Sequence, residues 1–367
     1  MGCDILPYSR EEGGAADCRD RPSMHLSDAY LSPAAGIAFW SAAAVLVTRG
    51  TARLARSERL GRTLPLVAAA AAMTFALRMV RFPLLGTAAC GHLTGGLLVA
   101  IVLGPDAAFL VLFAVQLVQA LAFADGGILA VGANAVNAAL WPAWFGRPLF
   151  QRLAPEGSGM GRVVAVAVAA ALLSHEMGAL GLAVAVGAGQ PGLATGRFLA
   201  LIAGAHVPLG VVEGLATAGL LVAGRRLLGD GTAGAIERAG GTAFLVVLGF
   251  SLFGAAVLSD FASRRPEWPA WSLAEAQAAS AAPPAPLAAA AIDLQRRIAI
   301  LPQYGESQSA KDLFGQAATS VAGLFGALAA AALALVPGSI LAGARRLLRA
   351  RSAAPVPPAA VNPYAPE

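Results

Sequence analysis

Long apolar runs, joined by short polar stretches, constrain the fold of this chain more than any other feature. Nine such runs can be delimited, at residues 33–48, 64–80, 93–103, 107–124, 128–145, 163–186, 198–222, 242–259 and 317–341. Only 13% of the residues are charged, whereas an ordinary soluble domain has roughly a quarter. Because a helix needs about 20 apolar residues to cross a bilayer, the pattern predicts an all-α, polytopic membrane helix bundle. The alternative, a soluble protein with an alanine-rich core, does not explain the regular recurrence of the runs.

The basic residues gather at the ends of these runs and predict an orientation. Arginines cluster in four places, within 49–62, 147–162, 225–238 and 345–351. Nine crossings place all four clusters on one side, which the positive-inside rule assigns to the cytoplasm. We therefore expect a multi-pass protein of a bacterial or archaeal cell membrane, with Met24 and His92 facing outside. The net charge of +5 then reflects topology, and we expect membrane lipid rather than nucleic acid around the chain. Arg78 and Arg81 depart from the pattern, at the outer end of the second run.

Composition divides the chain into successive parts. Residues 1–23 contain no apolar core and do not form a signal peptide. Residues 24–228 are expected to form a membrane domain of about seven helices, and residues 240–350 a second domain with two helices. Between those two helices, residues 260–316 are polar and rich in Ala and Pro, which indicates a long external loop. The Pro-rich tail, 351–367, is expected to be disordered.

The dipeptide Met24–His25 can form a metal chelate if Met24 is the first residue of the protein. Its free amine, the deprotonated amide nitrogen of His25 and the His25 ring then supply three nitrogens nearly in one plane. A fourth nitrogen completes a square-planar site, a geometry typical of Ni(II) or Cu(II), and His92 in its glycine-rich loop is the candidate. An internal Met24 has only an amide nitrogen without a basic lone pair. The site therefore requires that translation starts at Met24 or that the preceding residues are removed.

Polar residues near this segment support the same site or serve as structural groups. Ser27 or Asp28 is expected to cap a helix opened by Pro33, and Asp28 is a candidate to keep the segment folded against the metal. Asn134 and Asn137 lie three residues apart and therefore share a helix face. They can act as hydrogen bonds between helices or hold an inserted peptide through its backbone.

Two further pairs of ionisable residues lie inside predicted membrane helices. His206 and Glu213 are seven residues apart and share a face, either as a structural pair or as part of an ion path. His175 and Glu176 are adjacent, so they point to different faces, and their role stays open. Ionisable groups inside a membrane are functional candidates by default.

Motifs for enzymatic catalysis are absent from the sequence. There is no Walker motif, no G-x-S-x-G and no HExxH, and the three cysteines form no CxxC pair that would hold zinc. We expect a protein that is not an enzyme, so any ATP hydrolysis must occur on a separate chain. A membrane metallohydrolase would need a general base near the metal, and Asp28 is the only candidate.

Several motifs resemble the substrate-capture proteins of the CbiM/NikM family. MHLSDAYLSP resembles the N-terminal signature of that family, and RFPLLGTAACGHLTGGLLVAIVLGPDAAF resembles its glycine-rich histidine loop. ALAFADGGILAVGANAVNAAL and HVPLGVVEGLATA are similar to its next two blocks, in the family order, over residues 24–222. Downstream, FASRRPEWPAW resembles the signature of the NikN/PDGLE auxiliary component, with Glu267 where Asp is usual.

The resemblance implies a capture protein fused to its auxiliary component, within a group I energy-coupling-factor transporter. Its substrate would be Ni²⁺ or Co²⁺, held by the Met24 amine, the His25 amide nitrogen and the rings of His25 and His92. Its partners would be a transmembrane coupling protein and ABC-type ATPase subunits. The alternative from another class is a metal-independent membrane scaffold or channel, in which the histidines only bridge helices.

Overall fold

The structure is a computed structural model that describes residues 25–57, 60–187, 189–190, 192–228, 245–261, 263, 265–276, 284–305 and 308–352. Met24, the extension 1–23 and residues 353–367 therefore lie outside the described residues. The elements, in chain order, are α1 (Pro33–Arg56), α2 (Leu60–Met79), strands β1 (Phe82–Pro83) and β2 (Cys90–Gly91), α3 (Gly96–Leu103), α4 (Pro105–Phe123), α5 (Val131–Trp141), the π-helical turn η2 (Pro142–Gly146), α6 (Arg147–Leu153), α7 (Met160–Gly187), α8 (Thr195–Leu228), the helix Leu245–Ala256, α10 (Trp268–Ala276), α11 (Pro286–Ile298), α12 (Gln308–Phe314) and α13 (Ala318–Ser352).

The predicted all-α membrane bundle is confirmed. Within the described ranges, six helices are long and apolar enough to cross a membrane: α1, α2, α4, α7, α8 and α13. The other three predicted runs form shorter helices. The third run gives α3, which ends at Gly104 with φ +86° before Pro105 opens α4. The fifth run gives α5, which continues through η2 into α6, so part of the expected loop 147–162 is helical.

The prediction that residues 260–316 form a loop is wrong for much of that range, because α10, α11 and α12 lie there. Alanine is a strong helix former, and proline is well tolerated in the first turn of a helix, so this composition is compatible with short helices. Pro286 opens α11, and Pro269 follows the first residue of α10. Tertiary contacts complete the explanation, since α10 packs against α8.

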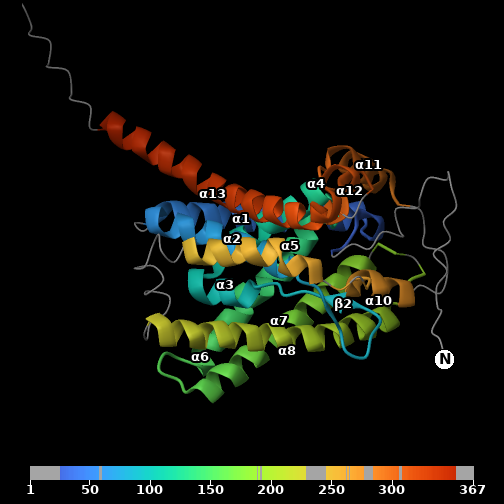
Figure 1. Cartoon of the computed structure of the whole chain (residues 1–367), viewed down its shortest axis with the longest axis horizontal. Coiled ribbons are helices and arrows are strands. Elements are labelled where there is room, and N and C mark those ends of the chain that lie inside the picture. The colour runs from blue at the N-terminus through green and yellow to red at the C-terminus, as the bar shows by residue number, and fades with distance from the viewer. Residues whose placement is uncertain are drawn as a thin grey trace, which may run out of the picture.

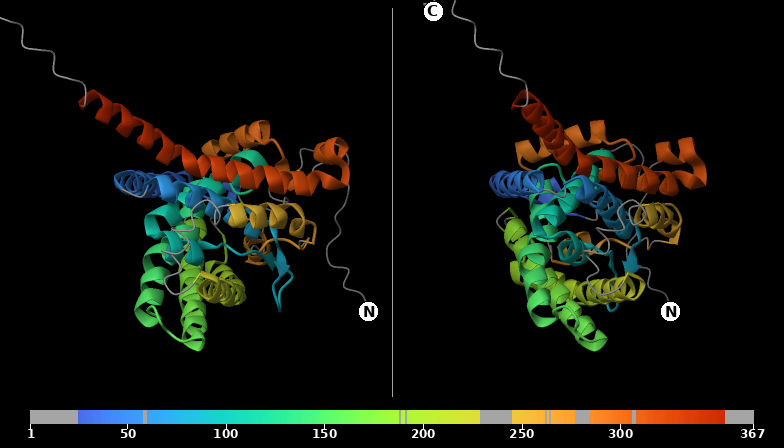
Figure 2. Two further views of the ribbon diagram at one scale, coloured as in Figure 1. Left: turned by 60° about the vertical axis from the view of Figure 1, so that its left-hand side comes forward. Right: turned by 90° about the vertical axis from the view of Figure 1, so that its left-hand side faces the viewer.

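Small residues allow the long helices to approach closely. Gly326 on α13 lies against the ring of Phe75 on α2, and Gly323 lies against the backbone of Ala255. Glycines also join α7 and α8, where Gly210 and Gly214 face the backbone of Leu172 and Val168. Packing through small residues is the usual way in which membrane helices associate. Figure 1 shows α7 and α8 running side by side, and α13 crossing one side of the bundle and projecting past it, as the views in Figure 2 also show.

The loop that carries His92 is held by the C-terminal half of the chain. Strands β1 and β2 pair antiparallel, with Phe82 opposite Gly91. The backbone N–H of Cys90 donates to the carbonyl of Pro266 at 2.9 Å, and Cys90 forms a parallel bridge with Glu267. The two halves of the sequence therefore meet directly beside His92.

Candidate metal centre

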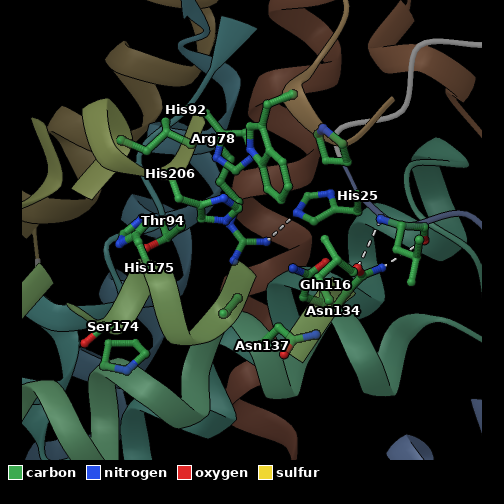
Figure 3. A pocket seen from close by; sticks show the side chains of 18 residues that line it. His25, Arg78, His92, Thr94, Gln116, Asn134, Asn137, Ser174, His175 and His206 are labelled. Atoms are coloured by element: carbon green, nitrogen blue, oxygen red, sulfur yellow. Dashed lines mark hydrogen bonds between the residues drawn. The ribbon is translucent and has the colours of Figure 1, made fainter. Parts of the chain in front are cut away.

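A buried cavity lies in the middle of the bundle, and all four histidines of the chain line it (Figure 3). Its volume, measured as space for the centres of water-sized spheres, is about 90 Å³. This is enough for several water molecules or a partly hydrated ion. Arg78 is the only formally charged residue among its lining residues, apart from any charge on the histidines. A cation entering this cavity therefore meets nitrogen ligands instead of carboxylates.

The first described residues enter the bundle as an extended peptide held by its backbone. The side chain of Asn134 accepts from the N–H of Leu26 and donates to its carbonyl, both at 3.1 Å. That carbonyl also accepts from the N–H of Gly127 at 2.9 Å. A Cβ at Gly127 would lie 1.8 Å from Asp28 Oδ1, so only glycine fits at this crossing. The prediction that an asparagine holds an inserted peptide matches the geometry of Asn134.

Asp28 anchors the same peptide one turn further on. Its Oδ1 accepts from the N–H of Ala130 at 2.8 Å, and the residue is fully buried. Burial raises the pKa of this carboxyl to about 6, against the opposing effect of backbone N–H groups such as that of Leu129. Ser27, and not Asp28, caps the short 3₁₀ turn, because its side chain accepts from the N–H of Ala29. Asp28 therefore holds the segment in place, as one of the two interpretations of the sequence expected.

The rings of His25 and His92 lie side by side, with centroids 5.6 Å apart and planes at 44°. His25 Nδ1 lies 3.1 Å from the carboxylate of Asp125, and its Nε2 lies 3.2 Å from a nitrogen of Arg78. Because an arginine nitrogen can only donate, Nε2 accepts in this arrangement and Nδ1 carries the hydrogen toward Asp125. A metal bound at Nδ1 must therefore replace the contact with Asp125.

His92 is held in a form suited to binding a metal. Its Nδ1 lies 3.3 Å from the carbonyl of Leu93, which places the hydrogen on Nδ1 and the lone pair on Nε2. Burial lowers the pKa of His92 well below its usual value, and the neighbouring His25 and Arg78 lower it further. Next to this loop, the carboxylate of Glu213 accepts from the N–H and the hydroxyl of Thr94, at 2.8 and 3.1 Å. Glu213 thus fastens the histidine loop to α8 and does not pair with His206.

Behind His25 lies a buried network that includes a residue from the C-terminal half. Arg78 is 0% exposed and donates to Gln119 at 2.7 Å, and Gln119 donates to the hydroxyl of Tyr304 at 2.8 Å. The Tyr304 hydroxyl donates in turn to the carboxylate of Asp125. The negative charge of Asp125 balances the buried guanidinium, which would otherwise be costly inside a bundle.

The remaining histidines line the same cavity. His175 on α7 and His206 on α8 have ring centroids 6.0 Å apart. The indole of Trp268, from α10, meets the His206 ring edge to face at 4.2 Å. In Figure 3, His25 lies on one side of the cavity and His175 and His206 on the other.

The structure thus gathers five of the predicted site residues at one cavity: His25, His92, Asn134, Asn137 and His206. Asp28 and Glu213 lie beside it and accept hydrogen bonds from the backbone of Ala130 and Thr94. Sequence analysis missed Arg78, Gln119, Tyr304 and Trp268 as parts of this centre. Arg78 carried a visible signal, because a charged residue near the end of an apolar run departs from the charge pattern. Trp268 lies in the motif FASRRPEWPAW and Tyr304 in the similar stretch PQYGES, but neither motif indicated a contact with the histidines, because both were assigned to an external loop.

No three His, Cys, Asp or Glu side chains gather into a closed metal site among the described residues. The imidazoles of His25 and His92 are the two cavity-lining rings at the inserted peptide, and His25 also contacts the carboxylate of Asp125. A four-coordinate site here therefore needs backbone or terminal nitrogens in addition to the rings. The ligands expected from the sequence, namely an amine, an amide nitrogen and two rings, have this composition.

A multi-pass helix bundle around a buried, imidazole-lined cavity defines a membrane protein with a site suited to a borderline metal cation. The family model described as "Cobalt uptake substrate-specific transmembrane region" (CbiM) matches residues 25–226, and a PDGLE domain matches residues 241–343. The chain belongs to the CbiM family and carries a fused C-terminal PDGLE domain, as the motifs indicated.

Curated and solved relatives are consistent with this membership. The chain is 32% identical over 222 residues to the cobalt transport protein CbiM of Streptomyces coelicolor, covering 59% of this chain and 93% of that protein. It is 37% identical over 124 residues to the fused nickel transport protein NikMN of Rhodobacter capsulatus, covering 32% of this chain and only 33% of that one. A crystal structure described as that of a transition metal transporter matches with a TM-score of 0.50 and 25% identity, covering 59% of this chain and all of the other.

Proposed function

We propose that this chain is the substrate-capture component of an ATP-driven uptake transporter for Ni²⁺ or Co²⁺. The metal is held by the amine of Met24, the deprotonated amide nitrogen and ring of His25, and the ring of His92. The observation that carries the proposal is the 5.6 Å separation of the His25 and His92 rings beside a peptide whose backbone is clamped by Asn134. The names of the relatives, cobalt and nickel transport proteins, agree with this substrate class.

The ligand set explains why a borderline metal is selected. Imidazole and amide nitrogens suit Ni²⁺ and Co²⁺, whereas Mg²⁺ and Ca²⁺ prefer oxygen ligands. The cavity lining contains no aspartate or glutamate, so the hard cations find no carboxylate there. Loading releases protons from the amine and the amide, which makes the affinity increase with pH.

The fused PDGLE domain completes the centre in this proposal. Trp268 and Pro269 line the cavity, and Tyr304 holds Asp125 behind His25. The domain thereby shapes the capture site of its own chain. Energy comes from separate subunits, namely a transmembrane coupling protein and ABC-type ATPases, because the sequence carries no Walker motif. The arginine clusters favour an orientation in which metal arrives at His92 from outside.

Isothermal titration of Ni²⁺ and Co²⁺ into purified protein tests the proposal. Wild-type protein is expected to bind one ion tightly, and His92→Ala should abolish that event. Ser174→Ala is the matched control, because Ser174 lines the same cavity but bonds only to its own helix, at the carbonyl of Ala170. Tight binding that survives His92→Ala would contradict His92 as a ligand, and no tight binding at all would support a metal-independent scaffold instead.

A further inference from the structure

The histidine pair on α7 and α8 is not used by the capture site described above. The close packing of Gly210 and Gly214 against α7 brings His175 and His206 together, with ring centroids 6.0 Å apart and planes at 58°. This spacing is close to the 5.6 Å between His25 and His92. Both pairs line one continuous cavity.

Hydrogen bonds within each helix fix which nitrogen of each ring is free. His175 Nδ1 lies 3.0 Å from the carbonyl of Ala171, and His206 Nδ1 lies 2.7 Å from the carbonyl of Ile202. A carbonyl oxygen only accepts, so each Nδ1 carries the hydrogen and each Nε2 keeps its lone pair. Metal-binding histidines are oriented in this way, by a hydrogen bond from the other ring nitrogen.

A purely structural role as a hydrogen-bonded link between helices does not describe this pair. Among the hydrogen bonds of the described residues, none joins the two rings, and each ring donates to its own helix. Trp268 covers His206, which is only 6% exposed.

We propose that His175 and His206 form a second, weaker binding station for the same divalent metal ion, through their two Nε2 atoms with water completing the shell. This proposal rests on the proposed function, because it concerns the ion that the capture site delivers. The station has two protein ligands where the capture site has four, so it binds less tightly and releases the ion more readily. A metal that binds at the two Nε2 atoms leaves the hydrogen bonds from each Nδ1 to its helix carbonyl intact.

Equilibrium dialysis of Co²⁺ against the protein that begins at Met24, in detergent, tests this station. Wild-type protein is expected to bind a second, weaker ion per chain in addition to the tight one. His175→Gln/His206→Gln should lose the weak ion and keep the tight one, because glutamine removes the imidazole but can still donate to the helix carbonyl. His92→Ala should do the opposite. Ser174→Ala should retain both.

The outcomes separate the two claims. A weak ion that persists in the double variant, or a wild-type protein that binds only one ion, overturns the second station while leaving the capture site intact. The proposed function itself is overturned if wild-type protein binds no ion tightly, or if His92→Ala still binds the tight ion. If the double variant does not fold, the single variants His175→Gln and His206→Gln decide, since each should weaken the second ion and leave the first unchanged.

Discussion

Tyr304, in the C-terminal PDGLE domain, donates its hydroxyl hydrogen to the carboxylate of Asp125, the same carboxylate that faces Nδ1 of His25. One carboxylate therefore connects the auxiliary domain to the candidate capture histidine. The tyrosine ring is fixed in turn by stacking on Phe123, with centroids 4.7 Å apart. The fused domain thus reaches His25 through the rigid side chain of Tyr304, in addition to Trp268 and Pro269, which line the cavity.

Replacing Tyr304 should weaken metal capture without removing its ligands. Tyr304→Phe keeps the stacking on Phe123 but removes the hydroxyl that donates to Asp125, so this carboxylate competes more strongly for Nδ1 of His25. Loss of one buried hydrogen bond to a charged group costs about 1.5–3 kcal/mol, which sets the upper limit of the effect. Titration of Ni²⁺ should show a reduced affinity with unchanged stoichiometry. An unaltered affinity would mean that the auxiliary domain does not act through this contact.

Asp125 is expected to matter more than a second aspartate at the other end of the same helix. Asp125→Asn removes the charge that orients His25 and balances Arg78, so metal affinity should fall by about 10–100-fold, as for other residues that orient metal ligands. Asp106 lies in the first turn of α4 and pairs with Arg49 at 2.9 Å and with Arg53 at 3.2 Å. Asp106→Asn is the control and should bind metal normally. Equal effects of both substitutions would refute the role given to Asp125.

The two asparagines of α5 should differ in their importance. Asn134→Ala removes both hydrogen bonds to the backbone of Leu26, at about 1 kcal/mol each, and so releases the peptide that carries His25. Metal affinity should fall on the order of 30-fold. Asn137 lines the same cavity, but its side-chain nitrogen has no hydrogen-bond partner, so Asn137→Ala should cost much less. Titration of both variants checks this, and the reverse order would contradict the account.

Asp28 should give the stability a distinctive pH dependence. Because burial raises its pKa to about 6, the native carboxyl holds a proton at pH values where the unfolded one, with its lower pKa, has lost it. The contribution of this group to stability is therefore present below the unfolded pKa and is lost as the pH rises toward 6, by at most about 3 kcal/mol. The asparagine side chain of Asp28→Asn cannot ionise, so this variant should not lose stability in this way as the pH rises.

Thermal unfolding in detergent between about pH 4 and pH 7 measures the effect. Other titrating groups act on both proteins alike, so the difference between wild type and Asp28→Asn isolates Asp28. That difference should favour the variant increasingly up to about pH 6 and then stay constant. A constant difference over the whole range would show that Asp28 keeps its ordinary pKa.

The fold and part of the site could be predicted because they depend on local patterns. Apolar runs predicted the helices, and the spacing of Asn134 and Asn137 predicted one shared face. The contact of Tyr304 with Asp125 could not be predicted, because the two residues lie 179 positions apart in the sequence. The contact of Trp268 with His206 could not be predicted either, because it joins the two domains. The partner of Glu213 could not be predicted either. Helical spacing alone places Glu213 on the same face as His206, whereas in the structure its carboxylate binds Thr94, in a loop from another part of the chain.

The central claim is that an unblocked amine at Met24 binds the metal together with His25 and His92. Its most direct test compares Ni²⁺ titrations of two proteins, one whose first residue is Met24 and one that keeps residues 1–23. We expect tight one-to-one binding only in the protein that begins at Met24, with mass spectrometry confirming each terminus. Equally tight, His92-dependent binding by the protein that keeps residues 1–23 would contradict the amine as a ligand.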